Sequence, residues 1–390
     1  MRKIRLKILS IVLSLVLACG CVSVSASEAS AGVVDADASF DLACKSAILM
    51  EAATGRVLYE QNADESLPPA SVTKIMTLLI VMEAIDSGVL RLSDKISVSA
   101  NAASMGGSQV FLEEGETMCA EDMLKSVIIS SANDAAVALA EHIAGSEEAF
   151  VQRMNARAAE LGMKNTCFEN TNGLDDTVTK HLTSARDIAI MSRELIKHEK
   201  ILEYSSIWMD TIRNGAFGLT NTNRLVRFYH GATGLKTGST AKARFCVSAT
   251  AKRGNMHLIC VVMGAETRDE RNAIAAKLLD YGFANFSLFS AQGRKLDEIK
   301  VTGGKEDSCA VSVGDFYALV SKGEESKISA VTEISESVKA PVKIGDTVGR
   351  VVYKIGETVV GEEKITATEN IDKIGFFDLW GRILLKFLIK

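Results

Sequence analysis

Residues 243–265 read ARFCVSATAKRGNMHLICVVMGA, and this stretch indicates how the chain folds. Ala243–Lys252 and Met256–Ala265 are β-prone runs, and the Arg-Gly-Asn sequence between them is typical of a hairpin turn. A second pair of apolar runs, Ser46–Tyr59, surrounds a Thr-Gly turn near the start of the chain. We therefore predict two β-hairpins that lie far apart in the sequence.

Between these hairpins, apolar residues recur at the spacing of an α-helix. We expect helices over 71–87, 120–143, 146–161 and 184–198, and a further helix over 270–283 after the second hairpin. Strands at both ends of a region, with helices between them, favour one α/β (α+β) domain with an antiparallel sheet. We predict that this domain covers residues 43–286.

The sequence changes character after this domain. Residues 287–370 contain short β-prone runs separated by glycine and charged residues, which predicts a small all-β domain. Residues 371–390 predict an amphipathic helix. One face carries a charge at every fourth position, and the opposite face is apolar and aromatic. The segment is shorter than the ~20 apolar residues of a spanning helix, so we expect an anchor on the membrane surface. A helix packed on the β domain is the alternative.

The N-terminus has the layout of a secretory signal peptide. A basic start is followed by the apolar run Ile8–Ala18 and by small residues that end at Ala26. We predict a signal peptide over residues 1–26, a linker over 27–42 and export of the remaining chain. A lipoprotein signal at Cys19 or Cys21 is the alternative.

Composition excludes other classes of protein. The 390 residues are 47% hydrophobic and carry a net charge of -5, which argues against nucleic-acid binding. The six cysteines after the signal peptide have no metal-ligand spacing, so we expect no metal site and no cofactor. Their even number permits disulfides, and isolated thiols are the alternative.

Three short motifs occur in order along the predicted α/β domain: Ser71-Val72-Thr73-Lys74, Ser131-Ala132-Asn133 and Lys236-Thr237-Gly238. A serine at a helix start has backbone N–H groups that favour negative charge, and Lys74 lies one turn further on the same face. Lys236-Thr237-Gly238 precedes the second hairpin, so we place it on a strand whose glycine lets a substrate approach.

These motifs resemble those of the penicillin-recognising serine enzymes. Their surroundings resemble the low-molecular-mass penicillin-binding proteins of peptidase family S11, which are D-alanyl-D-alanine carboxypeptidases. The similar stretches are residues 69–77, 131–136, 154–174 with its Asn-Gly-Leu sequence at 172–174, 184–187, 236–243 and 262–264. The resemblance implies a serine β-lactamase/transpeptidase-like fold, peptidoglycan stem peptides as substrates, β-lactam antibiotics as inhibitors, and a place at the outer face of the bacterial cytoplasmic membrane.

The resemblance also implies residue roles. Ser71 corresponds to the acylated serine, Lys74 to its general base and Ser131 to the proton shuttle toward the leaving amine. The backbone N–H groups of Ser71 and Ser239 correspond to an oxyanion hole. The expected substrate-binding residues are Asn133, Lys236, Thr237, Gly238, Ser239 and Arg271.

The resemblance implies that Lys236 and Thr237 bind the terminal carboxylate of the substrate and that Arg271 helps to hold it. Two positions on this carboxylate side have alternatives. Arg271 has an alternative role as a surface salt-bridge partner. Some family members carry an arginine before Lys-Thr-Gly, and here Thr222 stands at that position, with Arg224 and Arg227 nearby.

Two other functions remain as alternatives. A serine β-lactamase uses the same three motifs together with a glutamate that activates water, and Glu169 lies in the corresponding part of the chain. A non-catalytic wall-binding relative is the second alternative. The joint presence of Ser71, Lys74, Ser131 and Lys236 argues against it.

Overall fold

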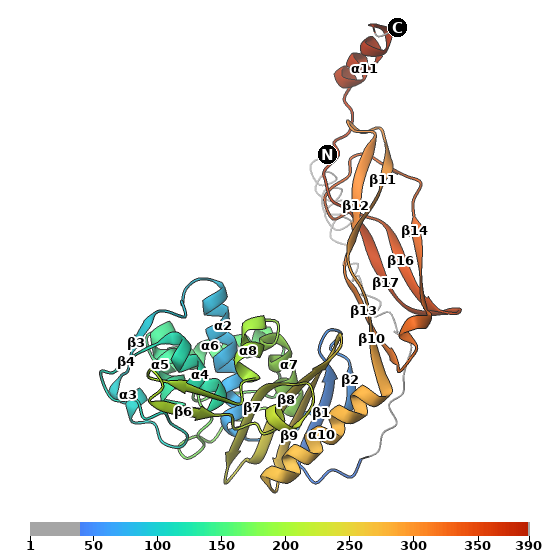
Figure 1. The fold of residues 1–390 in the computed structure, drawn as a ribbon. Coiled ribbons are helices and arrows are strands. Elements are labelled where there is room, and N and C mark those ends of the chain that lie inside the picture. Colours follow the sequence, from blue (N-terminus) through green and yellow to red (C-terminus); the bar gives the residue numbers. More distant parts are fainter. Residues whose placement is uncertain (1–39, 389–390) are drawn as a thin grey trace, which may run out of the picture.

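The computed structural model describes residues 40–388. Figure 1 shows an α/β domain from which an elongated β domain extends, with helix α11 at the far end. The predicted signal peptide, residues 1–26, lies outside the described residues, as do residues 27–39 of the predicted linker.

The α/β domain is built on an antiparallel sheet of five strands in the order β2-β1-β9-β8-β7. The two predicted hairpins meet in its centre, where β1 pairs with β9 and Leu49 lies opposite Cys260. The turn between β8 and β9 contains two residues, because Arg253 pairs with Met256. The strands are β1 (Ser46–Glu51), β2 (Val57–Gln61), β7 (Ala232–Thr240), β8 (Arg244–Arg253) and β9 (Met256–Ala265).

Both faces of this sheet are covered, which explains the unbroken apolar run Leu258–Met263 within β9. Ile259, Val261 and Met263 join one hydrophobic cluster, which contains the helices between the hairpins. The alternate residues Leu258 and Cys260 join a second cluster under helix α10. Because side chains alternate along a strand, a central strand covered on both sides must be apolar at every position. Figure 1 shows α10 on the opposite side of the sheet from α2 and α7.

Helices fill the region between the hairpins, as the apolar spacing predicted. Two small hairpins, β3 (Lys95–Ser97) with β4 (Thr117–Cys119) and β5 (Met209–Ile212) with β6 (Phe217–Thr220), lie at the edge of this region and were not predicted. The helices are α2 (Lys74–Asp86), α3 (Ala100–Ala103), α4 (Ala120–Ile129), α5 (Asn133–Ala144), α6 (Glu147–Glu160), α7 (Ala185–Leu195), α8 (Glu199–Ser205), α9 (Leu225–Phe228) and α10 (Arg268–Asn285).

Two helix predictions are corrected. The run over 120–143 is two helices, because Ser131 between them has a φ of 63°, which is incompatible with a right-handed helix. The helix expected over 71–87 begins as a 3-10 turn, η1 (Ala70–Thr73), and continues as α2. Both breaks fall at the predicted motifs.

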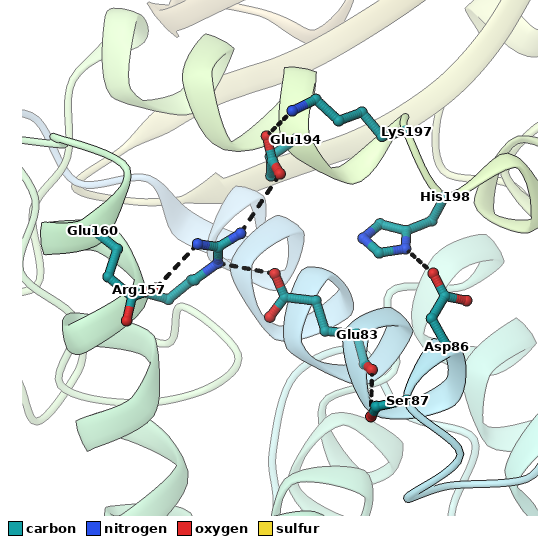
Figure 2. Close-up of polar contacts among 8 residues, drawn as sticks. All are labelled: Glu83, Asp86, Ser87, Arg157, Glu160, Glu194, Lys197 and His198. Atoms are coloured by element: carbon teal, nitrogen blue, oxygen red, sulfur yellow. Dashed lines mark hydrogen bonds and ion pairs between the residues drawn. The ribbon is translucent and has the colours of Figure 1, made fainter. Parts of the chain in front are cut away.

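Ion pairs fix the C-terminal end of α2 to neighbouring helices. Figure 2 shows Arg157 of α6 between Glu83 of α2 (2.8 Å) and Glu194 of α7 (3.5 Å). His198 contacts Asp86 at the end of α2 (Nδ1 to Oδ2, 2.6 Å). Partly exposed pairs of this kind contribute little stability singly, so their main effect is to orient α2.

The β domain has one core, shared by a six-stranded sheet and a two-stranded ribbon. The sheet order is β14-β16-β17-β12-β11-β15, and β11 with β15 is the parallel pair. The predicted boundary after residue 286 falls at the start of the ribbon strand β10. The strands are β10 (Phe286–Ala291), β11 (Arg294–Thr302), β12 (Ser308–Val313), β13 (Phe316–Ser321), β14 (Ile328–Ile334), β15 (Ser337–Lys339), β16 (Thr347–Ile355) and β17 (Thr358–Ala367), with the 3-10 turn η2 (Glu325–Lys327) before β14.

The chain ends in helix α11 (Phe376–Leu388). Phe376, Phe377 and Trp380 are exposed on it, and Arg382 forms an ion pair with Asp307 of the β domain (2.8 Å). Within residues 40–388, none of the helices has the length and hydrophobicity needed to cross a membrane.

Candidate active site

A cleft of about 570 Å³ lies where η1 meets strand β7 and the loop before α5. It brings together residues from all three motifs, although their positions are about 60 and 105 residues apart in the sequence. The predicted residues that line it are Ser71, Ser131, Thr237, Gly238, Ser239 and Arg271. Lys74, Asn133 and Lys236 are buried beside it.

Lys74 is the centre of the site's polar contacts. Its Nζ lies 2.9 Å from Ser71 Oγ, 2.5 Å from Asn133 Oδ1 and 2.8 Å from the carbonyl oxygen of Asn172. The side chain is completely buried. Burial and the positive charge of Lys236 lower the pKa of Lys74 well below its usual value, although the charge of Asp134 opposes this shift.

The three contacts fit a neutral amine. A neutral lysine amine has two hydrogens and one lone pair. The oxygens of Asn133 and Asn172 can only accept, so they take the two hydrogens. In the neutral form that the lowered pKa favours, the lone pair is left for Ser71, whose Oγ lies 2.9 Å from Nζ and whose hydroxyl can donate to it. This arrangement makes Lys74 an acceptor for the Ser71 proton.

The break between α4 and α5 places the second motif. Ser131 has left-handed backbone geometry and lines the cleft, while Asn133 begins α5. The Asn133 amide is fixed because its Nδ2 donates to Gly106 O (2.7 Å) while its Oδ1 accepts from Lys74. Buried Asp134 accepts from the backbone N–H groups of Val110 and Leu112, and so holds the loop that carries Gly106.

Gly238 lets strand β7 approach the serine. A Cβ at this position would lie 2.8 Å from Ser71 N and 2.9 Å from Val72 N, so a larger residue would push β7 away. Lys236 is buried, and its Nζ donates to Thr237 O (2.9 Å). Burial, and secondarily the charge of Arg271, lowers the pKa of Lys236 to about 7.

The carboxylate side of the cleft is rich in guanidinium groups. Arg271 is buried, so it is not a surface salt-bridge residue. Burial and the charges of Arg268 and Arg224 lower the pKa of Arg271 to about 10. Thr222 lines the same side and accepts a hydrogen bond from Thr237 (Oγ1 to Oγ1, 2.8 Å). Arg224, Arg268 and Arg271 together give this end of the cleft an affinity for an anion, although Asp269 pairs with Arg224 (3.8 Å).

Sequence reasoning gave no role to the loop that supplies Asn172. The loop is closed at its base by antiparallel bridges of Cys167 with Leu182 and of Leu67 with Thr183. Gly173 (φ 87°) crosses the catalytic turn so closely that a Cβ would lie 1.9 Å from Ala70 O. The Asn-Gly-Leu sequence was recognised, but a backbone carbonyl gives no residue-specific signal.

His181 joins this loop to the serine turn. Its Nδ1 accepts from Glu169 N (2.9 Å), and its Nε2 lies 2.7 Å from Thr73 Oγ1. Thr73 Oγ1 already donates to Ala70 O (2.8 Å), so Nε2 carries the hydrogen and the ring is neutral. Burial lowers the pKa of His181 to about 4. A single histidine in a loop offered no pattern that could have predicted this contact.

Glu169 is not placed as a water-activating glutamate. Its carboxylate accepts from the backbone N–H groups of Thr179 (3.0 Å) and Lys180 (2.7 Å) on the exposed side of the loop. It does not belong to the lining of the cleft.

The six described cysteines are free thiols. This agrees with isolated thiols, the alternative to disulfides in the sequence analysis.

Comparison with known proteins assigns the family. The family model described as D-alanyl-D-alanine carboxypeptidase matches residues 32–267, and the model of the C-terminal domain of penicillin-binding protein 5 matches residues 283–373. The chain belongs to the D-alanyl-D-alanine carboxypeptidase family. The predicted resemblance is confirmed.

Individual relatives match between 63% and 87% of the chain. D-alanyl-D-alanine carboxypeptidase DacF of Bacillus subtilis is 44% identical over 347 residues, covering 87% of this chain and 89% of that protein. The crystal structures of penicillin-binding protein 5 from Haemophilus influenzae match with a TM-score of 0.75 and 30% identity over 86% of this chain and 99% of that one. Penicillin-binding protein D2 of Listeria monocytogenes in its ampicillin-bound form matches 63% of this chain and 100% of that one, at 32% identity and a TM-score of 0.58. The predicted fold class is confirmed in both domains.

The neutral state of His181 predicts a pH-dependent stability. Its native pKa of about 4 lies below the ordinary value of about 6.5, so between these values only the unfolded chain binds the proton. The free energy of unfolding therefore falls by up to about 3 kcal/mol as the pH drops through this window. In urea unfolding, the free energy of unfolding of wild type minus that of His181→Gln should rise from pH 4 to pH 6.5 and then level off.

His257 provides the matched control, because burial also lowers its pKa to about 4 while it contacts Thr233 away from the serine. His257→Gln should change the pH dependence of stability similarly. Only His181→Gln should slow penicillin labelling at pH 7, roughly tenfold or more, because it frees the turn that carries Ser71. Equal labelling rates for the two variants would show that His181 does not position the serine.

Proposed function

We propose that the chain is a serine-type D-alanyl-D-alanine carboxypeptidase that removes the terminal D-alanine from peptidoglycan stem pentapeptides through an acyl-enzyme on Ser71. The observation that carries the proposal is the contact of Ser71 with a buried Lys74 whose other two partners can only accept hydrogen bonds. Deprotonating a serine near neutral pH requires such a base within hydrogen-bond reach.

Acylation begins at the penultimate D-alanine. Ser71 Oγ attacks its carbonyl carbon while the hydroxyl proton passes to Lys74 Nζ. Negative charge develops on the carbonyl oxygen, and the backbone N–H groups of Ser71 and Ser239 stabilise it. The C–N bond then breaks, and the leaving amine takes a proton through Ser131. Attack of water on the ester releases the shortened peptide and restores the Ser71 hydroxyl.

The substrate carboxylate accounts for the charges around Lys236. Burial and the positive charge of Arg271 lower the pKa of Lys236, and burial and the charges of Arg268 and Arg224 lower the pKa of Arg271. A carboxylate held by Thr237, Lys236 and Arg271 would relieve this repulsion and favour the charged form of Lys236. Asn133 would donate to the substrate's peptide carbonyl through the second hydrogen of Nδ2, because the first is donated to Gly106 O.

Binding of β-lactams follows from the same chemistry, since a strained cyclic amide with a carboxylate presents the same two groups. The ampicillin-bound form of the Listeria relative supports this inference. The position of Glu169 away from the cleft argues against the β-lactamase alternative, because the acyl-enzyme then lacks that base for rapid hydrolysis.

Substitutions at Ser71 and Lys74 test the acylation step. Ser71→Ala should abolish labelling by a fluorescent penicillin and release of D-alanine. Lys74→Arg places a permanently charged group at this position that cannot accept a proton, so its acylation rate should fall by at least about 100-fold. Ser87→Ala, an exposed serine at the other end of α2, serves as the control and should label normally. Wild-type acylation by the arginine variant would disprove the general-base role.

We also propose that the protein is exported and held at the outer face of the cytoplasmic membrane by α11. The sequence of the N-terminus supports export. The exposed ring face of Phe376, Phe377 and Trp380 supports insertion into the lipid interface. The three rings are 70%, 86% and 53% exposed, and α11 lies at the end of the molecule that is remote from the cleft (Figure 1).

Truncation and substitution test the anchor. Ile371 is buried and pairs with Val342, so the deletion should begin after it, at Gly375, to leave the β domain intact. Loss of residues 375–390 should abolish flotation with vesicles containing anionic phospholipid while penicillin labelling is unchanged. In the full chain, Phe377→Glu should weaken flotation and Asp378→Asn on the polar face should not. Full flotation of the truncated protein would refute the anchor.

A further inference from the structure

The cleft continues past the carboxylate-binding residues to an aromatic wall. Thr222 contacts Thr237 through its hydroxyl, and the preceding residue, Asn221, donates its backbone N–H to Trp208 O (2.9 Å). Trp208 and Phe228 line the same cleft as Ser71 and Thr237. The wall therefore lies next to Thr237, the residue proposed above to bind the substrate carboxylate.

The wall is built from a ring pair and a cation. The Trp208 and Phe228 rings lie edge to face, with centroids 6.3 Å apart. The Arg227 guanidinium lies 5.4 Å from the Trp208 centroid and 5.6 Å from that of Phe228. Within residues 40–388 the shielded indole Nε1 of Trp208 has no hydrogen-bond partner, so ring contacts hold the indole. Phe228 is 74% exposed, so one side of its ring is available to a ligand in the cleft.

We propose that Trp208 and Phe228 form a subsite for the side chain of the leaving D-amino acid, and that the enzyme releases residues with linear aliphatic side chains as well as D-alanine. This inference rests on the proposed function. In the leaving residue, the carboxylate and the side chain are bonded to the same carbon. A carboxylate held by Thr237 therefore places the side chain next to Thr222, whose short side chain leaves the wall accessible.

A chain of three or four carbons extends further from the shared carbon toward the two rings than the methyl group of D-alanine does. Apolar contact with two aromatic rings favours methylene groups. Arg224 and Arg268 also line this part of the cleft, so an acidic side chain is the rival occupant. Arg224 has Asp269 as an ion-pair partner (3.8 Å), which reduces its attraction for a second carboxylate.

The experiment compares diacetyl-L-Lys-D-Ala-D-Xaa peptides in which Xaa is alanine, norleucine or glutamate. All three form the same acyl-enzyme, so hydrolysis of the ester cannot distinguish them, and kcat/KM reports acylation alone. We expect wild type to cleave the D-norleucine peptide at least as efficiently as the D-alanine peptide. The ratio of interest is kcat/KM for the D-norleucine peptide divided by kcat/KM for the D-alanine peptide. Phe228→Ala should lower this ratio about fivefold or more, mainly through the KM of the D-norleucine peptide.

Two further variants make the result specific. Trp208→Phe keeps a ring and should lower the ratio less than Phe228→Ala, which guards against a variant that merely misfolds. Tyr317→Ala removes an exposed ring from the β domain and should leave the ratio unchanged. An unchanged ratio in Phe228→Ala, or a preference of wild type for D-glutamate over D-norleucine, would overturn the proposal. Absence of D-alanine release and of penicillin labelling in wild type would instead disprove the proposed function.

Discussion

The site depends on keeping the amine of Lys74 uncharged inside the protein. A buried ammonium group loses its hydration, and the nearby charge of Lys236 adds repulsion, so the neutral form is favoured. Two acceptor oxygens, from Asn133 and Asn172, then orient the amine so that its lone pair is left for Ser71. Lys74, Asn133 and Asn172 each come from a different segment of the chain. The site exists only when all three segments are in place.

The fold supplies those segments by close backbone approach. Gly238 brings strand β7 against the serine turn, and Gly173 brings the loop of Asn172 against the same turn from another direction. His181 ties that loop to Thr73 through a neutral ring. The central sheet contributes rigidity, because β9 is buried on both faces and β7 is joined to it through β8. Chemistry at Ser71 is thus controlled by backbone positions as much as by side chains.

Much of this could be predicted from the sequence, because the informative signals were local. Apolar spacing predicted the hairpins and most helices, and the spacing of Ser71 and Lys74 predicted their contact. The break at Ser131 was missed because left-handed geometry at a serine has no sequence signature. Asn172 acts through its carbonyl, and His181 through a contact with Thr73 that lies 108 residues away in the chain. Such contacts depend on the tertiary fold, which neither periodicity nor motif spacing encodes.

The protonation state of Lys74 is the most direct test of this account. In protein labelled with ¹⁵N-lysine, the Lys74 Nζ resonance can be assigned by its loss in Lys74→Arg and followed as a function of pH. The account predicts a neutral amine at pH about 8, where an ordinary lysine with a pKa of about 10.4 is charged. A Lys74 resonance that remains that of an ammonium group up to pH about 10 would contradict the account.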